Sequence, residues 1–200
     1  MNLAARTPLP VLSLTVFSIA FGIEEAIIVV YLRHSPGAYM PRAFALEGFR
    51  ELTTLFVIGA IAWLTANSAA LRARAFCFSF GLWDIVYYVA LWKLTGFPSI
   101  TDNDVLFLIP VPWIAPVWAP VSFAVVLILI GLFGHATRRG VLLAAGFALA
   151  LLSFVYRTAF GVSDYPIWLF LLALALALAS LPVETGMLPG RPETVRRRGL

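Results

Sequence analysis

The sequence has 200 residues, of which 62% are hydrophobic and only 12% are charged. Soluble domains carry roughly 25% charged residues, and the mean hydropathy here is +0.95, so the composition excludes an ordinary soluble domain. The net charge is +4, but no basic stripe with interleaved aromatic residues is present. A nucleic-acid partner is therefore not expected, and the lipid bilayer is the expected environment.

The apolar segments predict an all-α, polytopic transmembrane helical bundle of about six spans, because each crossing needs roughly 20 residues. The expected spans are Pro10–Leu32, Leu52–Leu71, Ala75–Leu94, Val117–Phe133, Val141–Tyr156 and Pro166–Leu181. We expect one helical domain over residues 1–182. Residues 183–200 are rich in Gly, Pro and Arg, and this composition predicts a disordered basic tail.

A proline-rich segment comes before the fourth span. It is apolar from Val105 onward but carries prolines at positions 110, 112, 116 and 120. Proline removes a backbone donor and clashes with the preceding helical turn, so residues 109–116 are not expected to be regular helix. We expect a short interfacial or re-entrant piece there, which at membrane depth must be buried in protein or face water.

Basic residues indicate the orientation. With six spans, the side that holds both termini carries nine basic residues, and the opposite side carries five. Cytoplasmic loops carry the excess of Lys and Arg, so both termini are expected in the cytoplasm. Lys93 is the only lysine among 14 basic residues, a bias that favours a bacterial chain and hence the inner membrane. Cys77 is the only cysteine, so no intrachain disulfide can form.

Two adjacent acids, Glu24 and Glu25, lie inside the first apolar span. A charge at the centre of a membrane helix costs about 2.5–3.5 kcal/mol on insertion scales, and such residues usually face a bundle interior. Glu25 shares a helical face with Thr15, Ser18 and Gly22 at spacings of three and four residues. Small and polar residues line helix–helix interfaces in membranes, so this face is expected to look inward, with Glu24 at its border.

Further acids and hydrogen-bonding groups fall near the outer ends of the later spans, and we expect them to converge with the glutamate pair on one outward-opening pocket. The predicted catalytic residues are Glu25, Asp84, Glu24, Tyr88 and Tyr87. The predicted substrate-binding residues are Arg50, Glu47, Glu51, Asp104 and Trp83. The candidate metal ligands are Glu25, Glu51 and Asp84.

Clustered carboxylates inside a membrane have three chemical uses. They can bind a divalent metal through oxygen ligands, share a proton and act as a general acid, or relay protons or cations. The cofactor is left unknown, with a divalent metal among the options. Haem is not expected, because His34 and His135 fall at opposite membrane faces, and nucleotide is not expected, because no glycine-rich phosphate loop is present.

Structural alternatives remain open for several of these residues. The intramembrane acids could form buried ion pairs with Arg33 or Arg50, and Glu47 and Glu51 could form a solvated face. Tyrosine and tryptophan residues could belong to an interfacial belt. Asp102, which precedes Asp104-Val105-Leu106, is expected to cap a helix rather than to bind a ligand.

The leading functional hypothesis is a multi-pass inner-membrane protein with a periplasm-facing pocket of carboxylates and tyrosines. It would act as an acid–base or metal-assisted enzyme on a small or lipid-like substrate, an isoprenoid among the options, because a neutral acid in an apolar pocket can protonate an olefin or epoxide. Two alternatives stand beside it. One is a proton- or cation-coupled transporter, although no inverted repeat is visible. The other is a non-catalytic accessory subunit whose acids pair with a membrane-protein partner.

Overall fold

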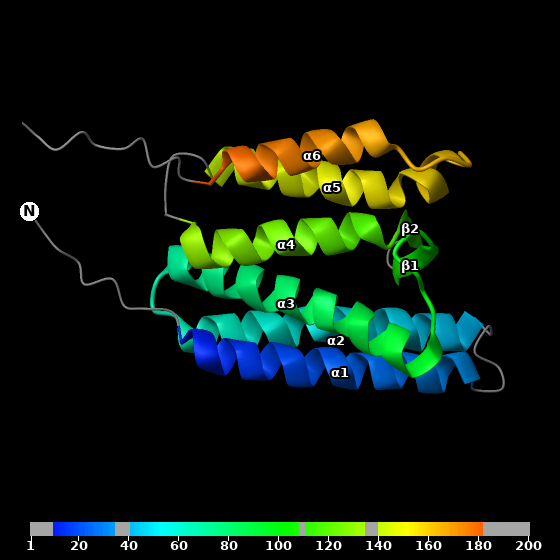
Figure 1. Cartoon of the computed structure of the whole chain (residues 1–200), viewed down its shortest axis with the longest axis horizontal. Helices are drawn as coiled ribbons and strands as arrows, with labels where there is room; N and C mark the ends of the chain where they lie inside the picture. The colour runs from blue at the N-terminus through cyan, green and yellow to red at the C-terminus, as the bar shows by residue number, and fades with distance from the viewer. Residues whose placement is uncertain (1–9, 35–40, 109–110, 135–139, 182–200) are drawn as a thin grey trace, which may run out of the picture.

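The computed structural model describes residues 10–34, 41–108, 111–134 and 140–181. In these residues the chain forms six helices and two short strands (Figure 1). The helices are α1 (Val11–His34), α2 (Pro41–Thr65), α3 (Ala69–Thr95), α4 (Trp118–Phe133), α5 (Gly140–Phe160) and α6 (Ile167–Ala179). The strands are β1 (Asn103–Phe107) and β2 (Trp113–Pro116).

The helices lie side by side with their long axes roughly parallel (Figure 1). Helices α1, α2 and α3 form one group, in which α3 packs against both α1 and α2. Helices α4, α5 and α6 form the second group, in which α4 and α5 both contact α6. Helix α4 also packs against α3. Helix α3 therefore joins the first group to the second, and the predicted helical bundle is confirmed in the described part of the chain.

Within the described residues, four helices are long and apolar enough to cross a membrane, which supports a membrane-embedded protein. They are Val11–His34, Ala45–Thr65, Ala69–Thr95 and Gly140–Phe160. The helices α4 and α6 are more apolar than these four but have only 16 and 13 residues. At 1.5 Å per residue they are about 24 and 20 Å long, somewhat short of a hydrocarbon core of about 30 Å.

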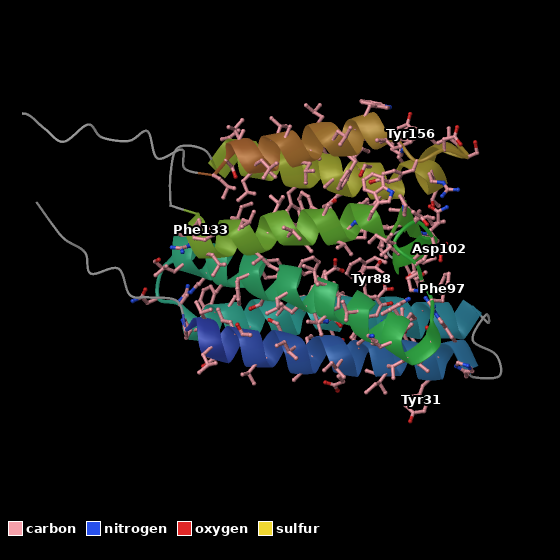
Figure 2. All side chains as sticks on the ribbon, viewed as in Figure 1. Tyr31, Tyr88, Phe97, Asp102, Phe133 and Tyr156 are labelled. Carbon is pink, nitrogen blue, oxygen red and sulfur yellow. The ribbon has the colours of Figure 1, made fainter. Side chains whose placement is uncertain are left out.

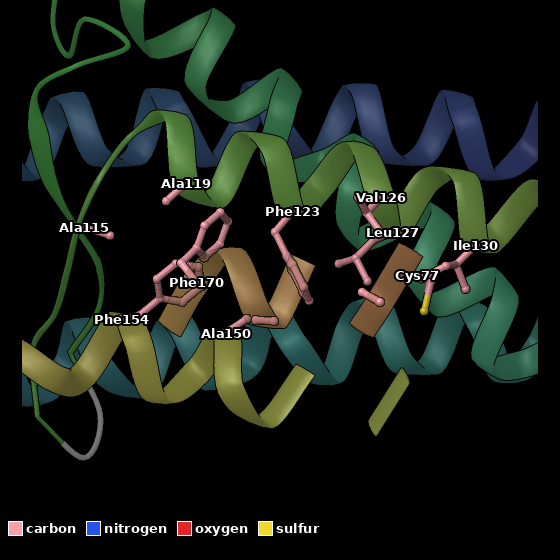
Figure 3. Close-up of a cluster of buried hydrophobic side chains, with 12 residues drawn as sticks. Cys77, Ala115, Ala119, Phe123, Val126, Leu127, Ile130, Ala150, Phe154 and Phe170 are labelled. Atoms are coloured by element: carbon pink, nitrogen blue, oxygen red, sulfur yellow. The ribbon is translucent and has the colours of Figure 1, made fainter. Parts of the chain in front are cut away.

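The core of the second group is aromatic and tightly packed (Figure 3). Phe123 of α4, Phe154 of α5 and Phe170 of α6 meet there, and the ring centroids of Phe154 and Phe170 are 5.9 Å apart. Close packing of this kind holds membrane helices together where lipid and side chain are equally apolar.

The small-residue face of α1 looks inward, as predicted. Ser18, Gly22 and Glu25 are buried, and Thr15 is half-buried. Gly22 lies against α3, where an added Cβ atom would stand 2.8 Å from the carbonyl oxygen of Trp83. Only a residue without a side chain allows α1 and α3 to approach this closely.

The boundary between α2 and α3 differs from the predicted one. The spans expected at Leu52–Leu71 and Ala75–Leu94 left Arg72 and Arg74 in the connection between them, but α2 ends at Thr65 and both arginines lie inside α3. Ser68 marks the start of α3. Its hydroxyl accepts a hydrogen bond from the N–H of Leu71 and so caps the N-terminus of this helix. The predicted basic tail, residues 183–200, lies outside the described residues, as do His135, Arg138 and Arg139.

The proline-rich segment contains an antiparallel hairpin that the sequence analysis did not foresee. In this hairpin β1 pairs with β2, with Asp104 opposite Ala115 and Val105 opposite Ile114. The expectation of non-helical backbone is confirmed for Trp113–Pro116, and the all-α expectation was incomplete. Proline is tolerated at strand ends, where no ladder donor is needed, and Pro116 occupies such an end.

We predict that Gly22→Ala lowers the thermal stability of the purified protein, by about 1–3 kcal/mol, because the new methyl group overpacks the α1–α3 contact. Gly59→Ala is the matched control, since an added Cβ there meets nothing within 4 Å. Thermal unfolding in detergent micelles measures both variants. Equal thermal unfolding midpoints for Gly22→Ala and Gly59→Ala would contradict a close contact between α1 and α3 at Gly22.

Candidate functional site

A cavity of about 460 Å³ lies between the two helix groups, and side chains from α1 to α5 and from the hairpin line it. Nine of the ten predicted site residues are among its lining residues: Glu25, Glu47, Arg50, Glu51, Trp83, Asp84, Tyr87, Tyr88 and Asp104. Figure 2 shows Tyr88 in this region, close to the hairpin. The structure therefore brings together residues that lie as far apart in sequence as α1 and β1, and their chemical roles stay predictions.

Arg50 organises the acids on one side of the cavity. Its guanidinium donates hydrogen bonds to Glu25 of α1 and to Glu47, one turn earlier on α2, where the Nε–Oε2 distance is 2.9 Å. Thr54 Oγ1 lies 3.5 Å from the other oxygen of Glu25. Glu25 is only 5% exposed, so its charge is compensated inside the protein. This arrangement is the buried ion pair with Arg50 that the sequence analysis gave as a structural alternative for the intramembrane acids.

Glu51 ties α2 to the hairpin. Its Oε2 accepts a hydrogen bond of 2.7 Å from the backbone N–H of Leu108, directly after β1. The side chain is 8% exposed, so it is not part of a solvated face. A buried backbone donor requires an acceptor, and Glu51 supplies it at a point where the strand ladder has ended.

Arg33 and Asp104 form a second ion pair, between the end of α1 and β1, with an Nη2–Oδ1 distance of 3.0 Å. Burial raises the pKa of the Asp104 carboxyl, and the guanidinium of Arg33 and the N–H of Val105 oppose this rise. The other oxygen of Asp104 is buried without a hydrogen-bond partner in the described residues, as are the indole N–H groups of Trp83 and Trp113. All three residues line the cavity, where a bound ligand or water would satisfy such atoms.

Asp84 differs from the other acids of the cavity. It lies near the middle of α3 and lines the cavity, but within the described ranges no side chain or backbone group is found as its hydrogen-bond or ion-pair partner. The four other lining acids are each held by Arg50, Arg33 or a backbone N–H. Asp84 is thus the one carboxyl group in this part of the chain that faces the cavity uncommitted.

An aromatic ladder runs along α3 on both sides of Asp84. It consists of Phe76, Phe80, Trp83, Tyr87 and Tyr88, all of which line the cavity. Successive ring centroids are 5.8, 5.4, 6.1 and 5.0 Å apart. The spacing of four, three and four residues places the first four rings on one helical face. The same spacing is visible in the sequence, and it could have added Phe76 and Phe80 to the predicted site residues.

Two residues named in the sequence analysis, Glu24 and Asp102, lie outside this arrangement. Glu24 is exposed and is not among the residues that line the cavity. Asp102 does not cap a helix, because the backbone after it is strand β1; its Oδ2 instead accepts a hydrogen bond from Ser99 N–H at 2.8 Å. Tyr31, which is 72% exposed, points away from the bundle (Figure 2), as an interfacial tyrosine would.

The metal hypothesis gains no support from the arrangement of the acids. Across residues 10–34, 41–108, 111–134 and 140–181, no three His, Cys, Asp or Glu side chains are placed to hold a metal ion together. Glu25 and Glu51, two of the three candidate ligands, are already bound to Arg50 and to the N–H of Leu108.

The opposite wall of the cavity is also aromatic, and the sequence analysis did not assign it to the site. Phe123 of α4 and Phe147 and Phe154 of α5 supply it, together with Trp113 of β2. In the sequence these residues look like ordinary lipid-facing or core positions, because only tertiary packing places them opposite α3.

Comparison of the chain with protein-family models, with curated proteins and with solved structures finds no match.

We predict that Arg50→Gln destabilises the protein strongly, by about 3–5 kcal/mol, because it leaves Glu25 and Glu47 buried without a cation. The triple change Glu25→Gln, Glu47→Gln and Arg50→Gln should recover most of this loss, since it removes all three charges together. Thermal unfolding of the native protein and the two variants tests the cluster. An Arg50→Gln variant as stable as the native protein would refute its structural role.

Proposed function

We propose that this chain is a membrane-embedded acid–base enzyme that acts on a lipid-like substrate, with Asp84 as the proton donor and acceptor. One observation carries the proposal: Asp84 lines the cavity without a hydrogen-bond or ion-pair partner in the described residues, while the other lining acids are engaged. A carboxyl group without a cationic partner is free to carry and release a proton, which general acid–base catalysis requires.

The neighbouring residues supply supporting roles in this proposal. Tyr87 and Tyr88 follow Asp84 by one helical turn and also line the cavity, so a phenolic hydroxyl can hydrogen-bond a substrate oxygen or help to orient the acid. Glu25, which the sequence analysis named with Asp84 among the catalytic residues, is a positioning residue in this proposal, because its carboxylate is held by Arg50 and Thr54. Arg50 holds α1 and α2 in register rather than binding substrate.

The character of the walls supports a lipid-like substrate. The lining is largely aromatic and aliphatic, and the cavity is partly open to the outside. Helices α2 and α5 both contribute to the lining but pack mainly against other elements, α2 against α3 and α5 against α6 and β2. In this proposal an amphiphile enters the cavity and places its tail along the aromatic walls.

A second candidate is a non-catalytic accessory subunit, and Glu24 favours it. This acid is exposed on α1, in a helix long and apolar enough to cross a membrane. An outward-facing carboxylate at membrane depth is costly unless something covers it. A partner helix that carries a basic or hydrogen-bonding side chain at the same depth would do so.

For the topology we propose six spans in a bacterial inner membrane, with both termini in the cytoplasm and the hairpin on the periplasmic side. The apolar helices α4 and α6 lie alongside α3 and α5 across the same layer (Figure 1), which supports counting them as crossings. The excess of arginine on the side of the termini supports the orientation.

The orientation can be tested with single cysteines. In a Cys77→Ala background, we expect Thr101→Cys, beside the hairpin, to react with a membrane-impermeant maleimide in intact spheroplasts. Asn67→Cys, in the α2–α3 turn, should react only after the membrane is permeabilised. Both native residues are exposed, so accessibility within the protein is matched. The reverse pattern would invert the proposed topology.

The catalytic proposal can be tested by isotope incorporation. Native protein in nanodiscs, supplied with a lipid extract of its host membranes in D₂O, should place deuterium on carbon in one lipid species detected by mass spectrometry. Asp84→Asn should slow this at least about 100-fold, the usual contribution of a general acid or base, while keeping its thermal midpoint. Glu24→Gln serves as the matched control, because it removes an acid that lies outside the cavity.

If no lipid species gains deuterium, or if Asp84→Asn labels it as fast as the native protein, the enzyme proposal is wrong. A transporter that uses the same acid would move its substrate without placing deuterium on carbon. An accessory subunit would show no turnover alone. It would co-purify with a fixed partner, and Glu24→Gln would weaken the binding of that partner.

A further inference from the structure

We infer that the substrate is an uncharged amphiphile with a carbon–carbon double bond, that Asp84 protonates this bond, and that the aromatic ladder stabilises the resulting carbocation. The inference rests on the proposed function, since it names the substrate class of the same site. It is carried by the position of Asp84 within a row of aromatic faces, inside an apolar cavity.

The ladder is suited to hold positive charge. Aromatic faces attract cations that lie within about 6 Å of the ring centroid, and the attraction is strongest where water is excluded. Trp83 and Tyr88 are only 5% and 6% exposed, and with Tyr87 they flank Asp84 along α3. In this inference, a cation formed next to the carboxyl group has three electron-rich side chains of the same helix as its neighbours.

The charge balance of the cavity disfavours an anionic substrate. Among the side chains that the structure describes, five acids line the cavity and two arginines, Arg33 and Arg50, do so. Both arginines already bind carboxylates, so neither is free to receive a phosphate, sulfate or carboxylate head group. The site instead fits a molecule that enters uncharged and becomes positive during the reaction.

The proposed step balances without a cofactor. The Asp84 carboxyl gives its proton to one alkene carbon, where a C–H bond forms from the π electron pair, and the neighbouring carbon becomes a cation. A carbon next to the cation then returns a proton to the Asp84 carboxylate, and its C–H electron pair forms a new double bond. The double bond has moved, Asp84 is regenerated, and nothing has been oxidised or reduced.

The test compares a stable cation with an uncharged molecule of the same shape. Dodecyltrimethylammonium places a positive nitrogen where the carbocation would lie, and 2,2-dimethyltetradecane is its neutral isostere. Binding of the radiolabelled cation to protein-loaded nanodiscs, corrected for empty nanodiscs, should saturate at one per chain. We expect it to bind roughly 30-fold tighter than the isostere, as a desolvated cation–π contact predicts, and dodecyl sulfate should not compete.

Variants of Tyr87 test whether the cation binds at the aromatic ladder. Tyr87→Leu removes a ring and should weaken the cation about tenfold or more, whereas Tyr87→Phe keeps the ring and should bind as the native protein does. Phe56→Leu is the matched control, because Phe56 is 70% exposed and lies on the outer face of α2. The comparison of cation and isostere on native protein stands even if Tyr87→Leu does not fold.

The two proposals fail in different ways. If deuterium enters a lipid through Asp84 but the cation binds no tighter than its isostere, the carbocation inference is wrong and the acid–base enzyme remains. The carbocation inference is equally wrong if the deuterium is found beside a carbonyl group instead of on a former alkene carbon. If no lipid gains deuterium, both proposals fall, whatever the binding data show.

Discussion

The guanidinium of Arg50 is the interaction on which the arrangement around the cavity depends. It binds Glu47 of its own helix, α2, and Glu25 of α1, so the pair between Arg50 and Glu25 links α1 to α2 by charge. A largely buried ion pair of this kind contributes little net stability compared with an apolar replacement. Its value here is geometric, because it fixes the wall that faces Asp84 and the aromatic ladder.

Much of the bundle could be predicted from the sequence because hydropathy and helix geometry are local properties. The inward face of α1 is an example: the spacing of Ser18, Gly22 and Glu25 was sufficient to orient the helix. The gathering of nine predicted residues around one cavity also followed from where acids fall along apolar spans. Charged groups in a membrane helix have few favourable positions, and this limits where such residues can lie.

Other features depend on contacts between distant segments, and the sequence could not supply them. The hairpin was missed because Asp104 and Ala115 pair across a turn rich in proline, a pattern that reads locally as irregular chain. The sequence also could not tell which acids are exposed, which are paired and which are unpaired. Glu24 and Glu25 are neighbours, but only packing decides that one is exposed and the other meets Arg50, and only packing leaves Asp84 uncommitted.

The hairpin is fastened to three separate helices. Arg33 of α1 binds Asp104, Glu51 of α2 accepts from Leu108 N–H, and Thr158 of α5 donates to the carbonyl of Pro112 at 2.6 Å. These contacts connect the two halves of the bundle at one end only, whereas α3 and α4 connect them along their length. Moving α1 and α2 away from α5 at this end would therefore require breaking an ion pair or a hydrogen bond to the hairpin, even if the contact between α3 and α4 stayed intact.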